Sequence, residues 1–209
     1  MADNFVITIG RQFGSGGRDI GRMVAERLGI KCYDKEIIEL AAQENNISQD
    51  ILEKHDEKPM SGFLSGMVSD IFSSGYSKSR FVDVSLEQQV FLAQFDTIKT
   101  LAEKESCVIV GRCGNYALQE HKNVLNVFVY ADMDFRVNQV LNVYQIEGVK
   151  KPAEFIMKMD KKRASYYNYY TNEEWGNAAS YDLCLNSSKF GVEGCVDIIL
   201  DVAKRMQEK

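Results

Sequence analysis

The sequence predicts an α/β fold in which a mainly parallel sheet is covered by helices on both faces. Short apolar, β-branched runs, which are typical of buried strands, alternate along the chain with longer segments of helical periodicity. A cluster of glycines follows the first of these runs directly, between Gly10 and Gly21. The length of 209 residues suits a single domain that can bury a sizeable core without disulfides or structural metals.

The strands and helices follow from local pattern. Apolar runs predict strands at 5–9, 31–33, 107–110, 124–130 and 183–185. Ile20, Val24 and Leu28 recur every four residues, which predicts a helix that begins near Gly17 and ends at Gly29. Further helices are expected at 35–44, 84–104, 151–171 and 191–206, with one that Asp132 opens. Residues 46–82 are rich in serine and glycine, which favours short helices joined by turns.

The composition excludes several classes of protein. Lys and Arg number 25 against 30 Asp and Glu, a net charge of −5, so general nucleic-acid binding is not expected. The five cysteines form no C-x-x-C pair and there are two histidines, which argues against a disulfide framework or a zinc site and favours the reducing cytoplasm. We find no signal-peptide pattern and no apolar stretch long enough to span a membrane.

The turn at residues 10–18, GRQFGSGGR, carries the clearest functional signal. A glycine-rich turn between a strand and a helix exposes backbone N–H groups, and the helix dipole adds positive potential for a phosphate. The Walker A pattern requires Lys and then Ser or Thr, but Gly17 and Arg18 stand there. Two other interpretations stay open: a turn without a ligand, and a dinucleotide site in which Asp34 is the acidic residue that follows the glycines.

The motifs ITIGRQFGSGGRDIG, KCYDKEII, VIVGRCGN, DKKRASYYNYYT and YDLCLN, in this order, resemble the cytidylate kinase-like family, a branch of the P-loop nucleoside monophosphate kinases. The resemblance spans nearly the whole chain and is weakest over 46–82. It implies a P-loop kinase-type three-layer α/β fold in one domain, 1–209. Within that domain it implies a helical acceptor-binding flap at 35–83 and a lid at 151–171.

The resemblance also implies a site for the donor, ATP. The residues expected to bind its phosphates are Arg11, Gly14, Ser15, Gly16, Gly17, Arg18 and Asp19. The family's phosphate-binding lysine aligns with Gly17, so Arg18 or Arg11 is expected to supply the missing positive charge. The family's magnesium-binding hydroxyl aligns with Asp19, whose carboxylate is a suitable ligand for Mg²⁺.

Acceptor-binding and lid residues follow from the same resemblance. Asp34 resembles the aspartate at the entrance to the flap, although the N-cap of the next helix is an equal alternative. Arg112 ends a buried strand and resembles the arginine that grips the acceptor phosphate, with Cys113 in place of the family's aspartate. In the lid, the basic residues are Lys161, Lys162 and Arg163, of which Arg163 aligns with a family arginine. We expect the tyrosines at 166–170 to pack between lid and core.

Together these features predict an enzyme, a phosphotransferase that moves the γ-phosphate of ATP to a small acceptor, with CMP as the first to try. Arg18, Arg112 and Arg163 would act with Mg²⁺ to position and neutralise the phosphates. One alternative is a nucleotide-binding regulatory or sensor protein without turnover, which the missing lysine favours. Another is a kinase of a non-nucleotide small molecule. The expected partner is a small molecule, with no nucleic acid and no membrane; the oligomeric state is not predicted.

Overall fold

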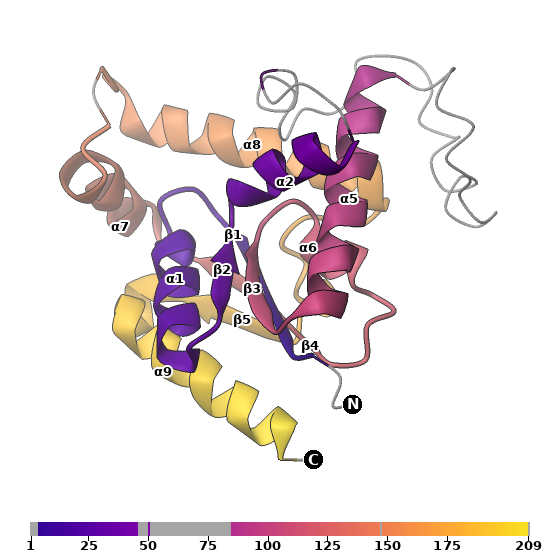
Figure 1. Ribbon diagram of the computed structural model, residues 1–209. Helices are drawn as coiled ribbons and strands as arrows, with labels where there is room; N and C mark the ends of the chain where they lie inside the picture. The colour runs from indigo at the N-terminus through magenta and orange to yellow at the C-terminus, as the bar shows by residue number, and fades with distance from the viewer. Residues whose placement is uncertain (1–3, 46–49, 51–84, 147, 209) are drawn as a thin grey trace.

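A computed structural model of the protein describes residues 4–45, 50, 85–146 and 148–208. Within them, five parallel strands form one sheet in the order β2-β3-β1-β4-β5 (Figure 1). The strands are β1 (Val6–Arg11), β2 (Lys31–Tyr33), β3 (Cys107–Val110), β4 (Val124–Tyr130) and β5 (Leu183–Asn186). The fold class and the five strands that the sequence predicts are therefore confirmed.

Helices connect these strands. They are α1 (Gly17–Leu28), α2 (Glu36–Asn45), α5 (Leu86–Lys104), α6 (Gly114–Ala117), α7 (Met133–Asn138), α8 (Pro152–Thr171) and α9 (Ser187–Gln207). A π-helix, η2 (Gln139–Val143), continues α7, and a short 3₁₀ turn, η3 (Ala178–Ser180), precedes β5. None of the helices among the described residues has the length and apolarity to cross a membrane.

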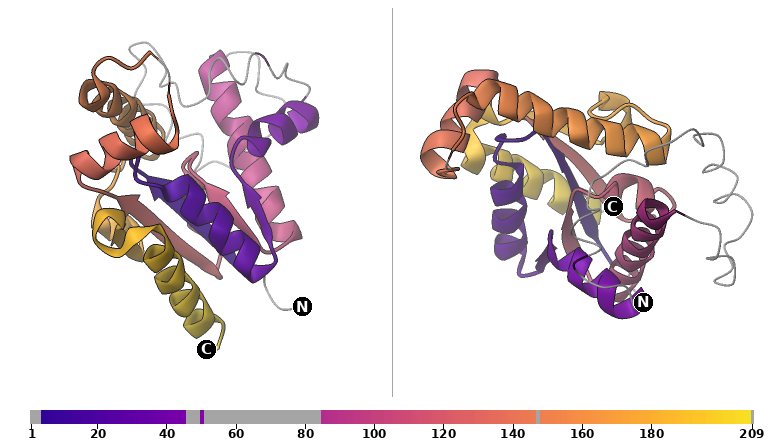
Figure 2. Two further views of the ribbon diagram at one scale, coloured as in Figure 1. Left: turned by 90° about the vertical axis from the view of Figure 1, so that its left-hand side faces the viewer. Right: turned by 90° about the horizontal axis from the view of Figure 1, so that it is seen from above.

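The central strand β1 divides the core into two layers because its alternate side chains point to opposite faces. Ile7 and Ile9 are fully buried against α1 and α9, whereas Val6 belongs to a second cluster with α5, α6 and α8 (Figure 2). Helix α8 crosses above the carboxyl ends of the strands (Figure 1). Parallel strands covered on both faces need apolar side chains throughout, which explains the continuous apolar runs in the sequence.

The structure tests three of the sequence predictions at particular residues. Helix α1 ends at Gly29 in the left-handed conformation (φ 65°), as expected for a glycine C-cap. Helix α2 begins at Glu36, so Asp34 is not its N-cap, and that alternative is wrong. Helix α9 begins at Ser187, where the Asn186 side chain accepts a hydrogen bond from the Ser188 N–H (3.0 Å) and caps it, but Gly191 (φ 70°, ψ 170°) interrupts the helical backbone. The helix predicted at 191–206 is the part of α9 that follows this kink. The predicted short helices at 46–82 and most of the flap at 35–83 lie outside the described residues.

The tyrosine cluster of α8 packs into the core, as predicted. Tyr166, Tyr167 and Tyr170 are all buried, and the Tyr170 ring stacks on Phe91 of α5 with centroids 4.0 Å apart and planes 5° apart. This contact fixes the carboxyl-terminal half of α8 to the layer formed by α5. The amino-terminal half of the same helix extends toward α7 (Figure 1).

Candidate functional site

The glycine turn joins β1 to α1 and leaves the N-terminus of α1 facing the carboxyl end of the sheet. Gly14 and Gly16 both adopt φ 77°, a left-handed conformation that L side chains rarely take. The Ser15 hydroxyl is turned away from solvent and donates to the carbonyl of Gln12 (2.9 Å). The backbone, rather than the serine side chain, is therefore the surface that a bound anion would meet.

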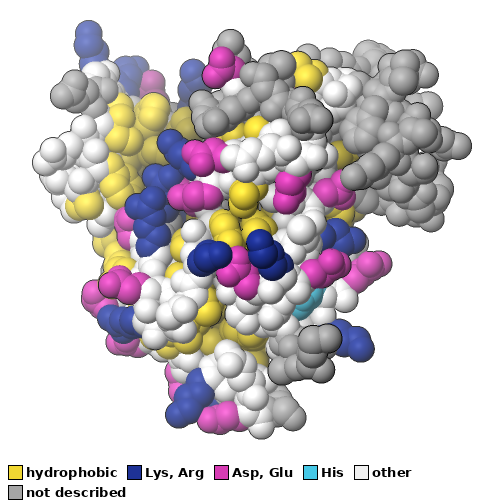
Figure 3. All heavy atoms as spheres, in the orientation of Figure 1, with side chains coloured by type: hydrophobic (Ala, Val, Ile, Leu, Met, Phe, Trp, Pro, Cys, Tyr) yellow, Lys and Arg dark blue, Asp and Glu magenta, His cyan; other side chains and the backbone are white. Residues whose placement is uncertain are grey.

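A cavity of about 600 Å³ opens beside this turn. Gly14, Gly16 and Gly17 line it on one side, and Tyr144, Ile146 and Met159 contribute further wall. Its charged lining residues are Arg11, Arg18, Asp34, Lys35, Arg112 and Arg163. The cavity thus brings together arginines from β1, α1, the end of β3 and α8, which the sequence separates by up to 152 positions. On the face seen in Figure 3, basic and acidic side chains are interspersed.

Asp34 is the centre of the arginine group. Its carboxylate accepts from the guanidinium of Arg18, and from Nη1 of Arg112 at 3.0 Å. Nη2 of Arg11 lies 3.8 Å from the same carboxylate. Burial alone would raise the pKa of Asp34, but the charges of the three arginines outweigh it, so the pKa of this carboxyl lies below its usual value. Asp34 is therefore a buried carboxylate that orients three cations.

Arg11 occupies the space that a P-loop lysine would need. A Cβ atom placed on Gly17 would lie 2.5 Å from Cβ of Arg11, closer than real atoms approach. The guanidinium of Arg11 then reaches over Gly111, where an added Cβ would lie 1.9 Å from Nη1. The absence of a side chain at Gly17 and the presence of Arg11 are thus two parts of one packing arrangement.

Arg112 lies in a strained turn after β3. Gly111, Arg112 and Cys113 have φ values of 79°, 50° and 55°, three successive left-handed residues of which two carry side chains. Arg112 is nonetheless 6% exposed, and its Nη1 also donates to the carbonyl of Val110 (3.3 Å). Such strain is concentrated at functional sites, where the surrounding structure holds it in place. Here it turns the Arg112 side chain back toward Asp34.

The three basic residues predicted for the lid, Lys161, Lys162 and Arg163, do not lie together around the cavity. Arg163 lines the cavity, donates from Nη1 to the carbonyl of Arg11 (3.2 Å), and lies over the Phe13 ring at 5.3 Å. Lys161 is exposed and Lys162 is half-buried, and neither is among the residues that line the cavity. The structure therefore brings one of these three residues to the arginine group.

Two residues that the sequence reasoning missed, Arg136 and Asp160, lie against the turn. Asp160 of α8 accepts from the Phe13 N–H at 2.7 Å, and Nε of Arg136, just beyond the start of α7, donates to the Phe13 carbonyl at 2.9 Å. Asp160 and Arg136 also form an ion pair with each other. Burial raises the pKa of the Asp160 carboxyl despite the opposing charge of Arg136. The one signal for this pair in the sequence was Asp160 itself, the single acidic residue within the basic stretch 158–163.

Asp19 lies on the first turn of α1 and is half-buried. Its carboxylate accepts from the Tyr144 hydroxyl at 3.0 Å, and it is not among the residues that line the cavity. In the described part of the chain, no group of three acidic, histidine or cysteine residues is arranged to hold a metal ion. Asp19 is thus a single carboxylate, suited to an ion that arrives with other oxygen ligands.

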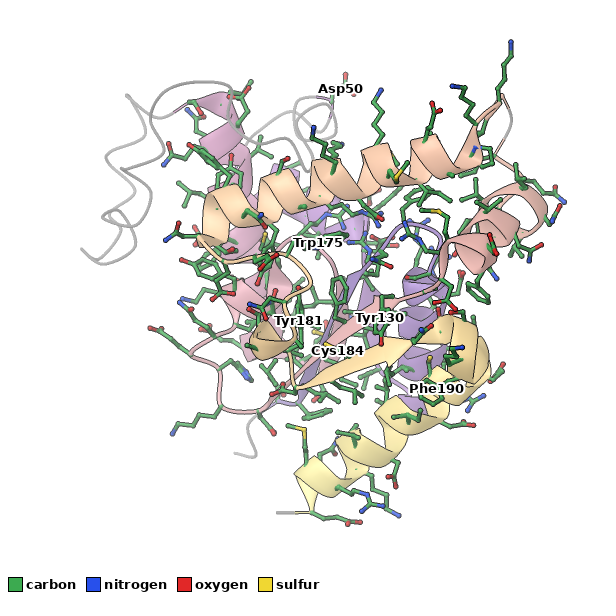
Figure 4. The ribbon with its side chains drawn as sticks, turned by 180° about the vertical axis from the view of Figure 1, so that it is seen from behind. Asp50, Tyr130, Trp175, Tyr181, Cys184 and Phe190 are labelled. Atoms are coloured by element: carbon green, nitrogen blue, oxygen red, sulfur yellow. The ribbon has the colours of Figure 1, made fainter. Side chains whose placement is uncertain are left out.

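The chain beyond β5 borders the turn from the other side. The Ser187 hydroxyl lies 2.6 Å from the carbonyl of Ser15 and 3.2 Å from that of Tyr130, and so ties α9 to the turn. Tyr130 and Phe190 are 38% and 54% exposed, at the end of β4 and on the first turn of α9 (Figure 4). Trp175 and Tyr181 instead pack on the Phe128 ring, with centroids 5.4 and 4.9 Å from it.

Comparisons with known proteins agree with this geometry. The sequence model of the cytidylate kinase-like family matches residues 6–189. A cytidylate kinase of Archaeoglobus fulgidus is 27% identical over 199 residues, which are 93% of this chain and 92% of the relative. A solved structure of an uncharacterized protein from Eubacterium ventriosum is 27% identical, with a TM-score of 0.68 over 96% of this chain and 99% of its own.

Solved structures of shikimate kinases share the fold at lower identity. The enzyme from Bacteroides thetaiotaomicron has a TM-score of 0.53 and 14% identity over 96% of this chain and 98% of its own. The enzyme from Aquifex aeolicus has a TM-score of 0.51 and 19% identity, with 98% of each chain covered. The architecture is therefore that of the P-loop kinases, and family and fold together support a small-molecule kinase. Because the family match extends over most of its length, this chain belongs to the cytidylate kinase-like family.

Proposed function

We propose that this protein transfers the γ-phosphate of ATP to a small acceptor, with CMP or a related nucleoside monophosphate as the first candidate. One observation carries the proposal: four arginines and one lysine, opposed by a single carboxylate, line a cavity that begins at a glycine turn. Phosphoryl transfer is catalysed mainly by positioning and charge neutralisation, and these are what such a cavity provides. The cavity also lies at the carboxyl ends of β1 and β3, where ligands of open α/β sheets bind.

The donor phosphates would lie on the glycine turn. Backbone N–H groups at the start of α1 would bind their oxygens, and Arg18 and Arg11 would neutralise them from two sides. Asp19, beside the cavity on the first turn of α1, would be the carboxylate that holds Mg²⁺, since the ion commonly takes one or two carboxylates and completes its shell with substrate phosphates and water. When bound, the ion would supply further neutralisation of the phosphate charge.

The acceptor would be held at the other end of the arginine group. Arg112 and Arg163, which both line the cavity, would bind the phosphate of the acceptor, and Asp34 is the carboxylate at the entrance to α2. A phosphate acceptor is already ionised at neutral pH, so this reaction needs no general base. The ion pairs with Asp34 would hold the arginine side chains in position until phosphate oxygens bind them, either in place of that carboxylate or together with it.

A second function, nucleotide binding without turnover, is favoured by the packing of Arg11 beside Gly17. An arginine cannot simply reproduce the geometry of the P-loop lysine, because its planar fork differs from a compact ammonium group. A protein of this kind would bind ATP but would form no ADP, whether or not an acceptor is present. The two functions therefore differ in a single measurable quantity, the turnover number.

The test uses Arg18→Ala, with Arg22→Ala on the same helix as a matched control. Arg22 is exposed and does not line the cavity. We expect Arg18→Ala to lower the rate of ADP formation about 100-fold, the typical effect of removing one charge-stabilising donor, and Arg22→Ala to leave it unchanged. ATP binding by the wild type, measured by calorimetry, with no ADP formed would overturn the kinase proposal and favour the sensor. ADP formation that no monophosphate stimulates would point to a non-nucleotide acceptor.

A further inference from the structure

The backbone of Phe13, within the glycine turn at residues 10–18, is held at both of its polar groups. Its N–H donates to Oδ1 of Asp160 (2.7 Å), and its carbonyl accepts from Nε of Arg136 (2.9 Å). The second carboxylate oxygen of Asp160 pairs with Nη2 of Arg136. Phe13, Asp160 and Arg136 thus form a closed ring of hydrogen bonds, which we call the Phe13 clamp. Its members come from the turn, from α8 and from α7.

The Phe13 clamp is shielded from water, which makes its hydrogen bonds costly to break. The side chains of Arg136 and Asp160 are 6% and 16% exposed. Gly14, the next residue, packs so closely on the backbone of Arg136 that an added Cβ would lie 2.8 Å from its carbonyl oxygen. Loss of either Arg136 or Asp160 would leave the other as an uncompensated buried charge. The ion pair is therefore costly to separate, and both side chains stay on the Phe13 backbone.

Side-chain contacts of Phe13 extend the same connection along α8. The Phe13 ring meets the Phe155 ring edge-on, with centroids 5.4 Å apart, and the guanidinium of Arg163 lies over its face. Arg163 also donates to the carbonyl of Arg11, two residues earlier. One face of α8 therefore holds both the backbone and the side chain of the segment that leads into the phosphate-binding turn.

We propose that Asp160 and Arg136 are positioning residues, which hold the glycine turn in its phosphate-binding shape and couple that shape to the seating of α8. The proposal rests on the proposed function, because it assigns the turn to the donor phosphates. Neither residue lines the cavity, so both act through the Phe13 backbone rather than by contact with substrate. Because coupling is reciprocal, a nucleotide bound at the turn would also tighten α8 against the core.

Four variants separate positioning from general stability. Asp160→Ala removes the acceptor of the Phe13 N–H, whereas Asp160→Asn keeps an acceptor oxygen at the same place and loses the charge. The double variant Arg136→Met with Asp160→Leu replaces the ion pair by apolar side chains, a change that folded proteins commonly tolerate. Ser165→Ala is the matched control, since Ser165 is exposed on the same helix.

Two measurements are made on each full-length variant: amide hydrogen exchange of residues 10–18 without nucleotide, and the Kd for ATP with Mg²⁺ by calorimetry. We expect Asp160→Ala and the double variant to speed exchange at Phe13 and to raise the Kd about tenfold, within the usual range of coupling between sites. Asp160→Asn should fall between the wild type and Asp160→Ala in both measurements, because its amide oxygen still accepts from Phe13 whereas Arg136 loses its charged partner. Ser165→Ala should match the wild type in both measurements.

The proposal is overturned if the double variant folds with unchanged exchange at Phe13, or if it binds ATP as tightly as the wild type. It is also overturned if Asp160→Asn is as impaired as Asp160→Ala, since that result would assign the effect to the charge alone. Should the wild type bind no ATP, the proposed function fails by itself. The exchange measurement still decides whether the clamp holds the turn.

Discussion

Asp34 sets the geometry of the arginine group, because its carboxylate contacts three guanidinium groups and is itself 5% exposed. Without it, Arg112 would remain buried beside other positive charges. The cost of that arrangement would appear as a loss of stability. It would also appear as a change in how stability depends on pH, because the pKa of Asp34 is shifted.

We predict that Asp34→Asn lowers the free energy of unfolding at pH 7 by about 3 kcal/mol, the usual cost of breaking a buried ion pair. The pKa of Asp34 in the folded protein lies below the ordinary value of 3.8. Its stabilising effect is therefore complete above that ordinary value and is lost as the pH falls through the folded pKa. Urea unfolding at pH 7 and near pH 3 should show a wild-type advantage that shrinks in acid. An advantage of the same size at both pH values would contradict this.

Gly17 and Arg11 form the second residue-scale arrangement with a testable consequence. Restoring the P-loop lysine by Gly17→Lys would press its Cβ on Cβ of Arg11, which is near the backbone and cannot swing away. We predict a loss of about 2 kcal/mol, typical of overpacking, and no gain in turnover. Thermal unfolding of Gly17→Lys beside Arg11→Gly/Gly17→Lys measures this, and the double variant, which removes the Cβ of Arg11, should recover part of the loss. A fully stable single variant would show that the packing argument fails.

The sequence identified the cavity residues that are arginine or glycine, since those residue types are the ordinary means of binding phosphate. It could not identify Arg136 or Asp160, because neither belongs to a phosphate-binding pattern and their contact joins α8 to residues near the start of α7. It also left two roles open for Asp34, acceptor binding and the N-cap of the next helix. The choice depended on where α2 begins, a boundary that shifts by a residue or two without any change in the pattern.

At the scale of the elements, α8 links the core to the site. Its carboxyl-terminal half is fixed by stacked aromatic rings, and its middle carries Asp160 and Arg163 against the glycine turn. The sequence pattern predicted this helix, and its tyrosines were expected to pack between lid and core. It did not predict the π-helix η2, where one wider turn places Tyr144 within reach of Asp19.

Tyr170 tests how α8 is fixed. Its hydroxyl is buried and has no hydrogen-bond partner among the described residues, so the ring alone accounts for the contact with Phe91. We predict that Tyr170→Ala lowers the free energy of unfolding by about 4 kcal/mol through the cavity it leaves. Tyr170→Phe should be neutral or stabilising, because it removes an unsatisfied polar group. Chemical denaturation of both variants checks this, and a destabilised Tyr170→Phe would reveal an unseen partner for the hydroxyl.

For the whole molecule, topology explains how distant residues form one site. The alternation of strands and helices predicted a parallel sheet, and parallel strands place all their carboxyl ends at one edge. Strand order was not predictable from periodicity, because the pattern within one strand does not show which other strand lies beside it. It is this order, with β1 between β3 and β4, that places the glycine turn next to the Arg112 turn.

A ligand that binds this edge should stabilise the whole fold. At a concentration of 100 times its Kd, ATP with Mg²⁺ is expected to raise Tm by about 8 °C, since binding to the folded state alone contributes about 2.7 kcal/mol. Arg18→Ala should reduce this shift, and the control Arg22→Ala should retain it. Equal shifts in both variants would place the nucleotide away from the arginine cavity.

The most direct measurement is the release of ADP from ATP and Mg²⁺ by the purified protein, first without an acceptor and then with CMP, dCMP, UMP, AMP and GMP in separate reactions. We predict slow release alone and strong stimulation by one monophosphate, with CMP or a close relative as the best. That result would establish phosphoryl transfer and identify the acceptor together. Absence of stimulation by all five, with ATP binding confirmed in parallel, would contradict the assignment of this cavity to a nucleoside monophosphate kinase.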